Sequence, residues 1–227
     1  MIGVVIPACN EEDSIQACLM AIQTAIAQLK DQSQVKIVVV LDSCEDRTLA
    51  IVQGYDVDYL RCDVRCVGKA RDLGVRYLIH HGATWIACTD ADSCVNMHWL
   101  NEQLKHQPAD LICGVVSIDH WQHLSLPTQA LYKAHYQDRM DHRHIHGANL
   151  SFSRDAYLNV GGFQGLHCHE DVDLVQRMLA KKCRVVWSNR VRVSTSSRLK
   201  GRVDEGFAHF LENLETKQQL LKKASSS

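Results

Sequence analysis

The sequence is poor in the residues that mark loop-rich or repetitive proteins, and it lacks a long apolar run. It holds 3 prolines and 12 glycines in 227 residues, which excludes a collagen-like or low-complexity chain. Lysine and arginine (25) nearly balance aspartate and glutamate (26), so neither a strongly basic nucleic-acid binder nor an acidic disordered chain fits. No apolar stretch approaches the ~18 residues of a membrane span, so we expect no integral membrane segment.

Cysteine is present, but not in patterns that bind zinc or build a disulfide scaffold. The ten cysteines include no C-x-x-C pair, and their density is well below that of disulfide-rich domains. Cys88 and Cys113 lie inside apolar runs and are predicted to be small buried residues. The N-terminal apolar run has no basic segment before it and is interrupted at Pro7, so we expect no signal peptide. These features predict a cytoplasmic protein with reduced thiols, and leave open a peripheral association with the inner face of the membrane.

Apolar runs alternate with helical patterns in the first half of the chain. Strands are predicted at 2–6, 35–41, 57–62 and 84–89, and helices at 13–30, 46–53 and 68–81. This alternation is typical of a parallel sheet with helices on both faces. The second half is mixed, with helices predicted at 96–107, 128–141, 170–182 and 203–223 and strands at 110–118, 148–152 and 183–193. Apolar residues make up 46% of the chain, so we expect one domain over 1–227 with a full core.

Polar side chains follow three of the predicted strands, at the sheet edge where α/β proteins bind ligands. These are the segment 7–11, the pair at 42–43 and the segment 90–92. Asp90 and Asp92 are two residues apart and could face one space, where a divalent cation takes oxygen ligands; a solvated turn or helix cap is the alternative. Asp42 could accept an N–H from uracil or guanine, or it could cap the helix predicted near residue 46.

Charged side chains also open two predicted helices. Lys69 and Arg71 stand at a helix start, where phosphates bind readily, and the alternative is an ordinary solvated basic turn. Glu170 and Asp171 open a later helix, where carboxylates are electrostatically favoured. The functional alternative for this pair is a general base next to a sugar acceptor.

Together these motifs resemble family 2 glycosyltransferases of the GT-A fold. The matching segments, in the family's order, are V-I-P-A-C-N-E-E (5–12), V-L-D-S-C-E-D-R-T (40–48), G-K-A-R (68–71), D-A-D (90–92), G-A-N-L (147–150), G-G-F (161–163) and E-D (170–171). The resemblance covers about residues 2–195 and implies an α/β fold with a Rossmann-like, mostly parallel sheet, helices on both faces and a mixed second half. It implies a nucleotide-binding half over 1–95, and an acceptor-binding half with a C-terminal helix over 96–227.

The resemblance also implies a role for each matching residue. The nucleoside would lie against Pro7, Ala8, Cys9 and Glu11, its base against Asp42 and Ser43, and Lys69 would lie near the nucleotide. The D-x-D motif of Asp90, Ala91 and Asp92 would contact the ribose and hold Mn²⁺ or Mg²⁺ through Asp92 and Asp90. The acceptor side would be lined by His146, Gly147, Asn149 and Glu170, with Asp171 as the general base.

The chemistry implied is metal-dependent, inverting transfer of a sugar from a nucleoside diphosphate to an acceptor hydroxyl. A UDP-sugar is the favoured donor, a GDP-sugar is the alternative, and a homodimer is left open. A nucleotidyltransferase of similar architecture is one alternative, but the expected glycine-rich basic loop is missing after the first strand. A non-catalytic nucleotide-sugar-binding module is another, and the presence of both Asp92 and Asp171 argues against it.

The sequence departs from the family pattern in three places. Position 9 is often aromatic in the family and is Cys9 here, and the segment 192–198 lacks the histidine that many relatives place on a late strand. No Q-x-x-R-W stretch occurs, which makes a processive polymer synthase a poor fit.

Two further groups of side chains have open interpretations. A loop with Arg198 and Arg202 could close over the diphosphate, or it could be a solvated basic loop. His142, His144 and His146 alternate and could bind zinc; the preferred interpretation is that they line the acceptor site or lie at the surface.

Overall fold

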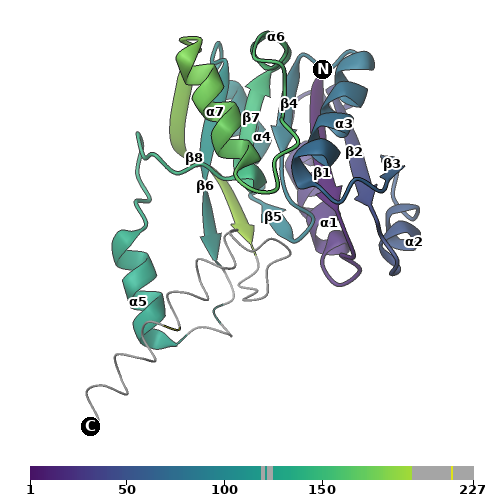
Figure 1. The fold of residues 1–227 in the computed structure, drawn as a ribbon, viewed down its shortest axis with the longest axis horizontal. Helices are drawn as coiled ribbons and strands as arrows, with labels where there is room; N and C mark the ends of the chain where they lie inside the picture. Colours follow the sequence, from purple (N-terminus) through teal and green to yellow (C-terminus); the bar gives the residue numbers. More distant parts are fainter. Residues whose placement is uncertain (119–120, 122–124, 196–215, 217–227) are drawn as a thin grey trace.

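The computed structural model of the chain describes residues 1–118, 121, 125–195 and 216. They build an eight-stranded sheet with the strand order β3-β2-β1-β4-β7-β6-β8-β5 (Figure 1). The strands are β1 (Ile2–Ala8), β2 (Val35–Asp42), β3 (Asp58–Cys62), β4 (Trp85–Cys88), β5 (Ser93–Val95), β6 (Leu111–Ile118), β7 (Leu150–Ser153) and β8 (Val185–Thr195). The helices are α1 (Ile15–Ala27), α2 (Thr48–Val52), α3 (Val67–His80), α4 (Trp99–Lys105), α5 (Leu126–His135), α6 (Arg154–Asn159) and α7 (Glu170–Ala180), with 3₁₀ turns η1 (Gln32–Gln34) and η2 (Gly147–Asn149).

The first four strands are parallel to one another, as the alternation of strands and helices predicts. β1 pairs with β2 and β4, and β2 pairs with β3, all in parallel. The second half is mixed: β7 is antiparallel to both β4 and β6, whereas β6 and β8 are parallel. Because parallel strands end at the same edge, the loops that follow β1, β2 and β4 meet there.

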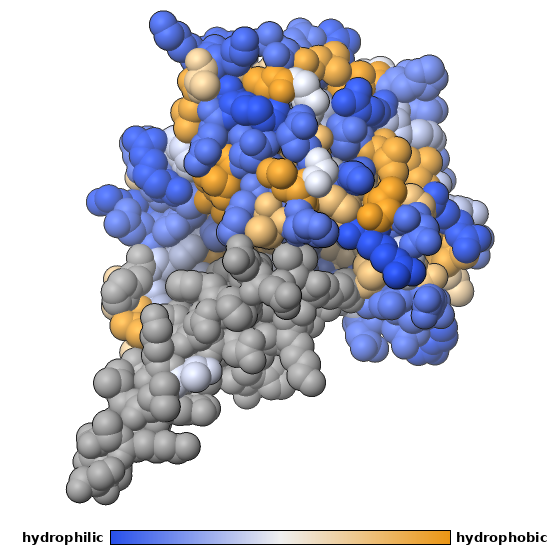
Figure 2. All heavy atoms as spheres, in the orientation of Figure 1, coloured by the Kyte–Doolittle hydropathy of each residue, from blue (hydrophilic) through white to orange (hydrophobic). Residues whose placement is uncertain are grey.

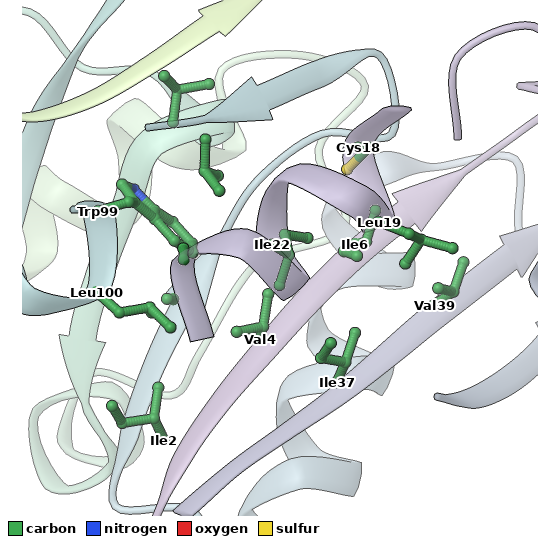
Figure 3. Packing of buried hydrophobic residues seen from close by; sticks show 14 of the residues in the cluster. Ile2, Val4, Ile6, Cys18, Leu19, Ile22, Ile37, Val39, Trp99 and Leu100 are labelled. Carbon is green, nitrogen blue, oxygen red and sulfur yellow. The ribbon is translucent and has the colours of Figure 1, made fainter. Parts of the chain in front are cut away.

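Two apolar cores lie on opposite faces of the sheet. On one face, Leu19 and Ile22 of α1 pack on Val4 and Ile6 of β1, with Trp99 of α4 beside them (Figure 3). On the other face, α3, α6 and α7 cover the sheet around residues from β1, β2, β4, β6 and β7. The strands β1, β2 and β4 are therefore covered on both sides, which explains their nearly continuous apolar sequences, whereas the edge strand β3 is only half-buried.

The cysteines behave as the sequence predicts. Cys88 and Cys113 are fully buried in the second core. All ten cysteines lie in the described part of the chain, and none forms a disulfide. The face that carries α3 and α7 is largely hydrophilic, with separate apolar patches (Figure 2). Among the described residues, no helix has both the length and the apolar composition needed to cross a bilayer.

Several elements differ from the sequence-based prediction. The helix predicted over 128–141 ends at His135, and the short elements β5 and α6 were not predicted. The predicted strand at 2–6 continues through Pro7 and Ala8, because both residues keep the register with β2. The helix predicted over 203–223 lies outside the described residues, apart from Thr216.

Candidate active site

The loops that follow β1 and β2 are locked together at the carboxyl edge of the sheet. The amide of Glu11 donates to Oγ1 of Thr48 (2.7 Å), and Oδ1 of Asn10 accepts from the amide of Glu45 (2.8 Å). Asn10 and Ser43 both adopt positive φ (52° and 56°), which Asn tolerates better than most residues. The segment predicted to cradle the nucleoside, from buried Pro7 and Ala8 through half-buried Cys9 to buried Glu11, is thus fixed beside the second loop.

Asp42 is buried at the end of β2 and is held by backbone amides. Its Oδ1 accepts from the amides of Val64 (2.8 Å) and Arg65 (3.0 Å), and its Oδ2 accepts from Cys66 (3.1 Å). The carboxylate therefore organises the turn that leads into α3, not the helix near residue 46. Ser43 lies beside it, with its hydroxyl 3.1 Å from Asp42 Oδ1.

A buried arginine joins the two carboxylate motifs. Arg71, only 3% exposed, lies on the face of α3 that packs against the sheet. Its Nη1 contacts Oε1 of Glu170 (2.5 Å), and its Nη2 donates to Oδ1 of Asp90. The guanidinium thus bridges the loop after β4 and the first turn of α7, which lie far apart in the sequence. This is neither the phosphate site nor the solvated turn that the sequence suggested for Arg71.

Two glycines make room for this arrangement. A Cβ on Gly147 would lie 2.7 Å from Cζ of Arg71, and a Cβ on Gly68 would lie 3.0 Å from Cβ of Glu170. The amide of Gly147 also donates to Oδ2 of Asp171 (2.6 Å), while Oδ1 of Asp171 accepts from the amide of Val172 (2.8 Å). The same backbone segment therefore supports the arginine and orients the predicted base.

The electrostatics of this cluster depend on burial and on the single arginine. Burial lowers the pKa of Arg71, but the charges of Asp90 and Glu170 more than offset this, so its pKa is raised. Burial raises the pKa of Glu170, although Arg71 opposes the effect. Burial likewise raises the pKa of Asp90, with Asp92 and Asp171 adding repulsion and Arg71 opposing both. The Asp90 side chain is 34% exposed, so water screens part of these interactions.

Asp90 and Asp92 fit a Mg²⁺ or Mn²⁺ site that is completed by a ligand. Among the described residues, no group of three or more His, Cys, Asp and Glu side chains could hold a metal. Mg²⁺ commonly uses only one or two carboxylates and takes its other ligands from substrate phosphates and water, so two carboxylates are compatible with such a site. Arg71 engages Oδ1 of Asp90, and the hydroxyl of Ser93 donates to Oδ1 of Asp92 (3.3 Å). Ala91 between them is buried.

Not every predicted site residue reaches this cluster through its side chain. Asn149 is fully buried; its Nδ2 donates to the carbonyls of Val115 (2.8 Å) and Val191 (2.9 Å), and its Oδ1 accepts from Trp99 (2.9 Å). These bonds give Asn149 a structural role between β6, β8 and α4 instead of a substrate contact. Lys69 is exposed in the first turn of α3, with its side chain against Gly165.

The three alternating histidines form an aromatic stack. The ring of His144 is stacked on Tyr136 at 4.1 Å and lies 5.3 Å from His142 and 6.0 Å from His146. Nε2 of His146 lies 3.1 Å from the Tyr136 hydroxyl, which accepts from the amide of Val116. Burial lowers the pKa of His146 to about 3, so its ring is neutral at physiological pH. Because no metal-holding group occurs among the described residues, the zinc interpretation is not supported. Arg198 and Arg202 lie outside the described residues.

Sequence reasoning singled out Arg71 but missed its role as a buried partner of two carboxylates. The buried positions of α3 are Gly68, Ala70, Arg71, Gly74, Val75 and Leu78. Arg71 thus occupies the apolar stripe, one turn before Gly74 and Val75. An arginine at a core-facing position needs carboxylate partners, since an unpaired buried charge is very costly. That position in the helical pattern was the signal that could have identified it.

Comparisons with known proteins match the fold of the chain. Solved structures with the same fold include TarS from S. aureus with UDP-GlcNAc, at 16% identity and a TM-score of 0.69 over 91% of this chain and 61% of that one. They also include the mannosyltransferase PcManGT from Pyrobaculum calidifontis with GDP-Man and Mn²⁺, at 17% identity and a TM-score of 0.67 over 88% and 58%. In another TarS structure the match spans 86% of this chain but 36% of that one, so this chain corresponds to only part of these proteins.

Sequence comparison identifies the family directly. No curated protein matches the sequence. The family model described as "Glycosyl transferase family 2" matches residues 3–156, more than half of the chain. Its span contains β2 to β7, all of β1 except Ile2, the D-x-D motif and Arg71. The chain has the GT-A fold and belongs to glycosyl transferase family 2.

Proposed function

We propose that the protein is a metal-dependent, inverting glycosyltransferase that moves a sugar from a nucleoside diphosphate to an acceptor hydroxyl. The observation that carries the proposal is the convergence of Asp90, Glu170 and Asp171 around Arg71 at the ligand-binding edge of the sheet. Structures with this fold hold UDP-GlcNAc and GDP-Man, which supports a nucleotide-sugar donor. A UDP-sugar remains the favoured donor and a GDP-sugar the alternative.

The residues of the chain divide the work between donor and acceptor. The interlocked loops after β1 and β2 supply the nucleoside site, and Asp92 and Asp90 would hold the cation. When bound there, Mn²⁺ or Mg²⁺ would supply Lewis-acid stabilisation of the negative charge that develops on the leaving nucleoside diphosphate. Asp171 takes the proton of the acceptor hydroxyl as that oxygen attacks the anomeric carbon from the side opposite the diphosphate. This single displacement inverts the configuration.

The orientation of Asp171 supports its assignment as the base. Its two oxygens accept from the amides of Gly147 and Val172, which fix the carboxylate without a cation paired to it in either bond. Glu170, in contrast, is buried and paired with Arg71. Asp171 is therefore the better placed of the two acids to accept a proton. The ten unbridged cysteines support a reducing compartment such as the cytoplasm.

Thermal unfolding tests the donor and metal sites without knowledge of the acceptor. We expect UDP or GDP together with Mn²⁺ to raise the melting temperature, because a ligand that binds only the folded state stabilises it. In Asp92→Asn the part of the shift that depends on Mn²⁺ should be lost. Asp155→Asn, an exposed acidic residue on α6, is the matched control and should keep the full shift. No shift with either nucleotide, with or without metal, would contradict the proposal.

A further inference from the structure

We propose that Arg71 is a positioning residue that holds Asp90 on the donor side and Glu170 on the acceptor side in one fixed arrangement. This inference rests on the proposed function, because it assigns the two ends of the cluster to the donor and the acceptor. Arg71 acts through these acids and does not itself need to touch the substrate. Its consequence is a division of roles in the Glu170–Asp171 pair: Glu170 anchors the start of α7, and Asp171 is left to serve as the base.

The geometry of the guanidinium supports this role. Nη1 and Nη2 diverge from one planar group, and each contacts a carboxylate from a different element. A guanidinium presents its donors in a rigid fork, so the two contacts set the separation of the carboxylates as well as their orientation. A lysine carries a compact charge on a flexible stem and could not define both contacts together.

The surroundings of Arg71 fix the arginine in turn. Its side chain is 3% exposed, and Gly147 leaves no room for it to move toward η2. The backbone of Gly68 lies close to Glu170 and to the segment before α7. A Cβ on Gly68 would lie 2.5 Å from the carbonyl oxygen of Gln164. The group formed by Arg71, Asp90 and Glu170 (the arginine clamp) is therefore enclosed by α3, η2 and the segment before α7. A change at any of these elements should shift both carboxylates.

Charge gives a second reason for a coupled unit. One buried cation faces two directly paired acids, with Asp171 close enough to add to the field. Loss of one partner from a buried ion pair leaves the other charge uncompensated, whereas removal of both is far less harmful. Arg71 and Glu170 should therefore behave as one unit in mutational experiments.

A double-mutant cycle on Arg71→Lys and Glu170→Gln tests the inference in two readouts. In kinetics, we expect each single variant to lower kcat by about 10²-fold, since small displacements of reacting groups have effects of this size. The change in the KM of the donor should be smaller. The double variant should be about as slow as the slower single variant, because residues that act as a unit are not additive. Arg76→Lys, on the exposed face of the same helix, is the matched control and should retain wild-type kcat.

Unfolding by urea provides the readout that does not require turnover. The double variant Arg71→Met/Glu170→Gln should unfold at a higher urea concentration than Arg71→Met alone. It removes the charge of Glu170, the more deeply buried of the two acids that lose Arg71. Two kinetic results would overturn the positioning role even if the stabilities are coupled. In one, the kcat losses of the two single variants multiply in the double variant; in the other, Arg71→Lys has the same kcat as the control Arg76→Lys. Lack of turnover by the wild-type protein with every nucleotide-sugar would overturn the proposed function, and the positioning role with it. If the enzyme is active and the effects of Arg71→Met and Glu170→Gln on the free energy of unfolding are additive, the arginine clamp is overturned but the proposed function is not.

Discussion

Replacement of Gly147 by alanine should damage the enzyme through Arg71, although the change adds only one methyl group. The new Cβ would lie 2.7 Å from Cζ and 2.8 Å from Nη2 of Arg71, and closer still to Nη1. These distances are below those of ordinary contacts, and the obstacle is a buried guanidinium with two ion-pair partners. Gly147 does not have a positive φ, so the effect comes from the methyl group and not from backbone strain.

The expected loss of folding stability in Gly147→Ala depends on how the clash between the new methyl group and Arg71 is relieved. If the backbone yields, overpacking costs about 1–3 kcal/mol. If Arg71 leaves its partners, the loss approaches the cost of breaking a buried ion pair, about 3–5 kcal/mol. An intermediate value of about 2–4 kcal/mol lowers the melting temperature by roughly 4–16 °C, at about 2–4 °C per kcal/mol for a chain of this size.

Differential scanning calorimetry and steady-state kinetics on Gly147→Ala provide the assay. The matched control is Gly54→Ala, where the new Cβ meets only the carbonyl of Ile51 at 3.2 Å on an exposed turn. We expect the control to melt near the wild-type temperature with wild-type kcat. If Gly147→Ala behaves like Gly54→Ala in both measurements, the tight packing of Arg71 against η2 is not what holds the site together.

Two further predictions address residues of the second half of the chain. Asn149→Ala removes the hydrogen-bond partner of three buried groups. In urea titrations it should lower the free energy of unfolding by about 3 kcal/mol or more, at about 1–3 kcal/mol per unsatisfied group. The control Asn101→Ala loses one exposed hydrogen bond and should cost under about 1 kcal/mol, and equal effects would contradict the structural role of Asn149. Burial lowers the pKa of His146 to about 3 in the folded state, so the unfolded chain binds more protons between about pH 6.5 and 3. The free energy of unfolding should therefore fall as the pH drops through that window. His146→Gln should flatten this pH dependence, and an unchanged slope would refute the prediction.

The sequence predicts the parallel half of the fold well, because its signals are local. The buried strands β1, β2 and β4 are nearly continuous apolar runs, and α1 and α3 carry apolar residues at helical spacing. β5 was missed because three residues carry no readable period, and this strand exists through its pairing with β8. The helix α5 ends earlier than predicted: the next residue, Tyr136, has an extended backbone, and its ring stacks on His144.

The site is harder to read from the sequence, because its partners are chosen in three dimensions. The motifs indicate which residues matter, but Asp42 could not be assigned to the amides of residues 64–66 without the turn that brings them together. Asn149 belongs to a matching motif, yet its bonds go to carbonyls on strands that follow no local pattern. Arg71 and Glu170 are 99 residues apart, and only the packing of α3 against α7 shows that they form a pair.

The most direct test of the account measures turnover with purified protein. A panel of UDP- and GDP-sugars is incubated with Mn²⁺, and release of the nucleoside diphosphate is followed for the wild-type protein and for Asp171→Asn. We predict release from at least one donor by the wild type, and a rate lower by about 10²–10⁴-fold in Asp171→Asn, with the Mn²⁺-dependent nucleotide shift in melting temperature retained. Equal release by both proteins would contradict the assignment of Asp171 as the base, and no release by the wild type from any donor would contradict the proposed glycosyltransferase activity.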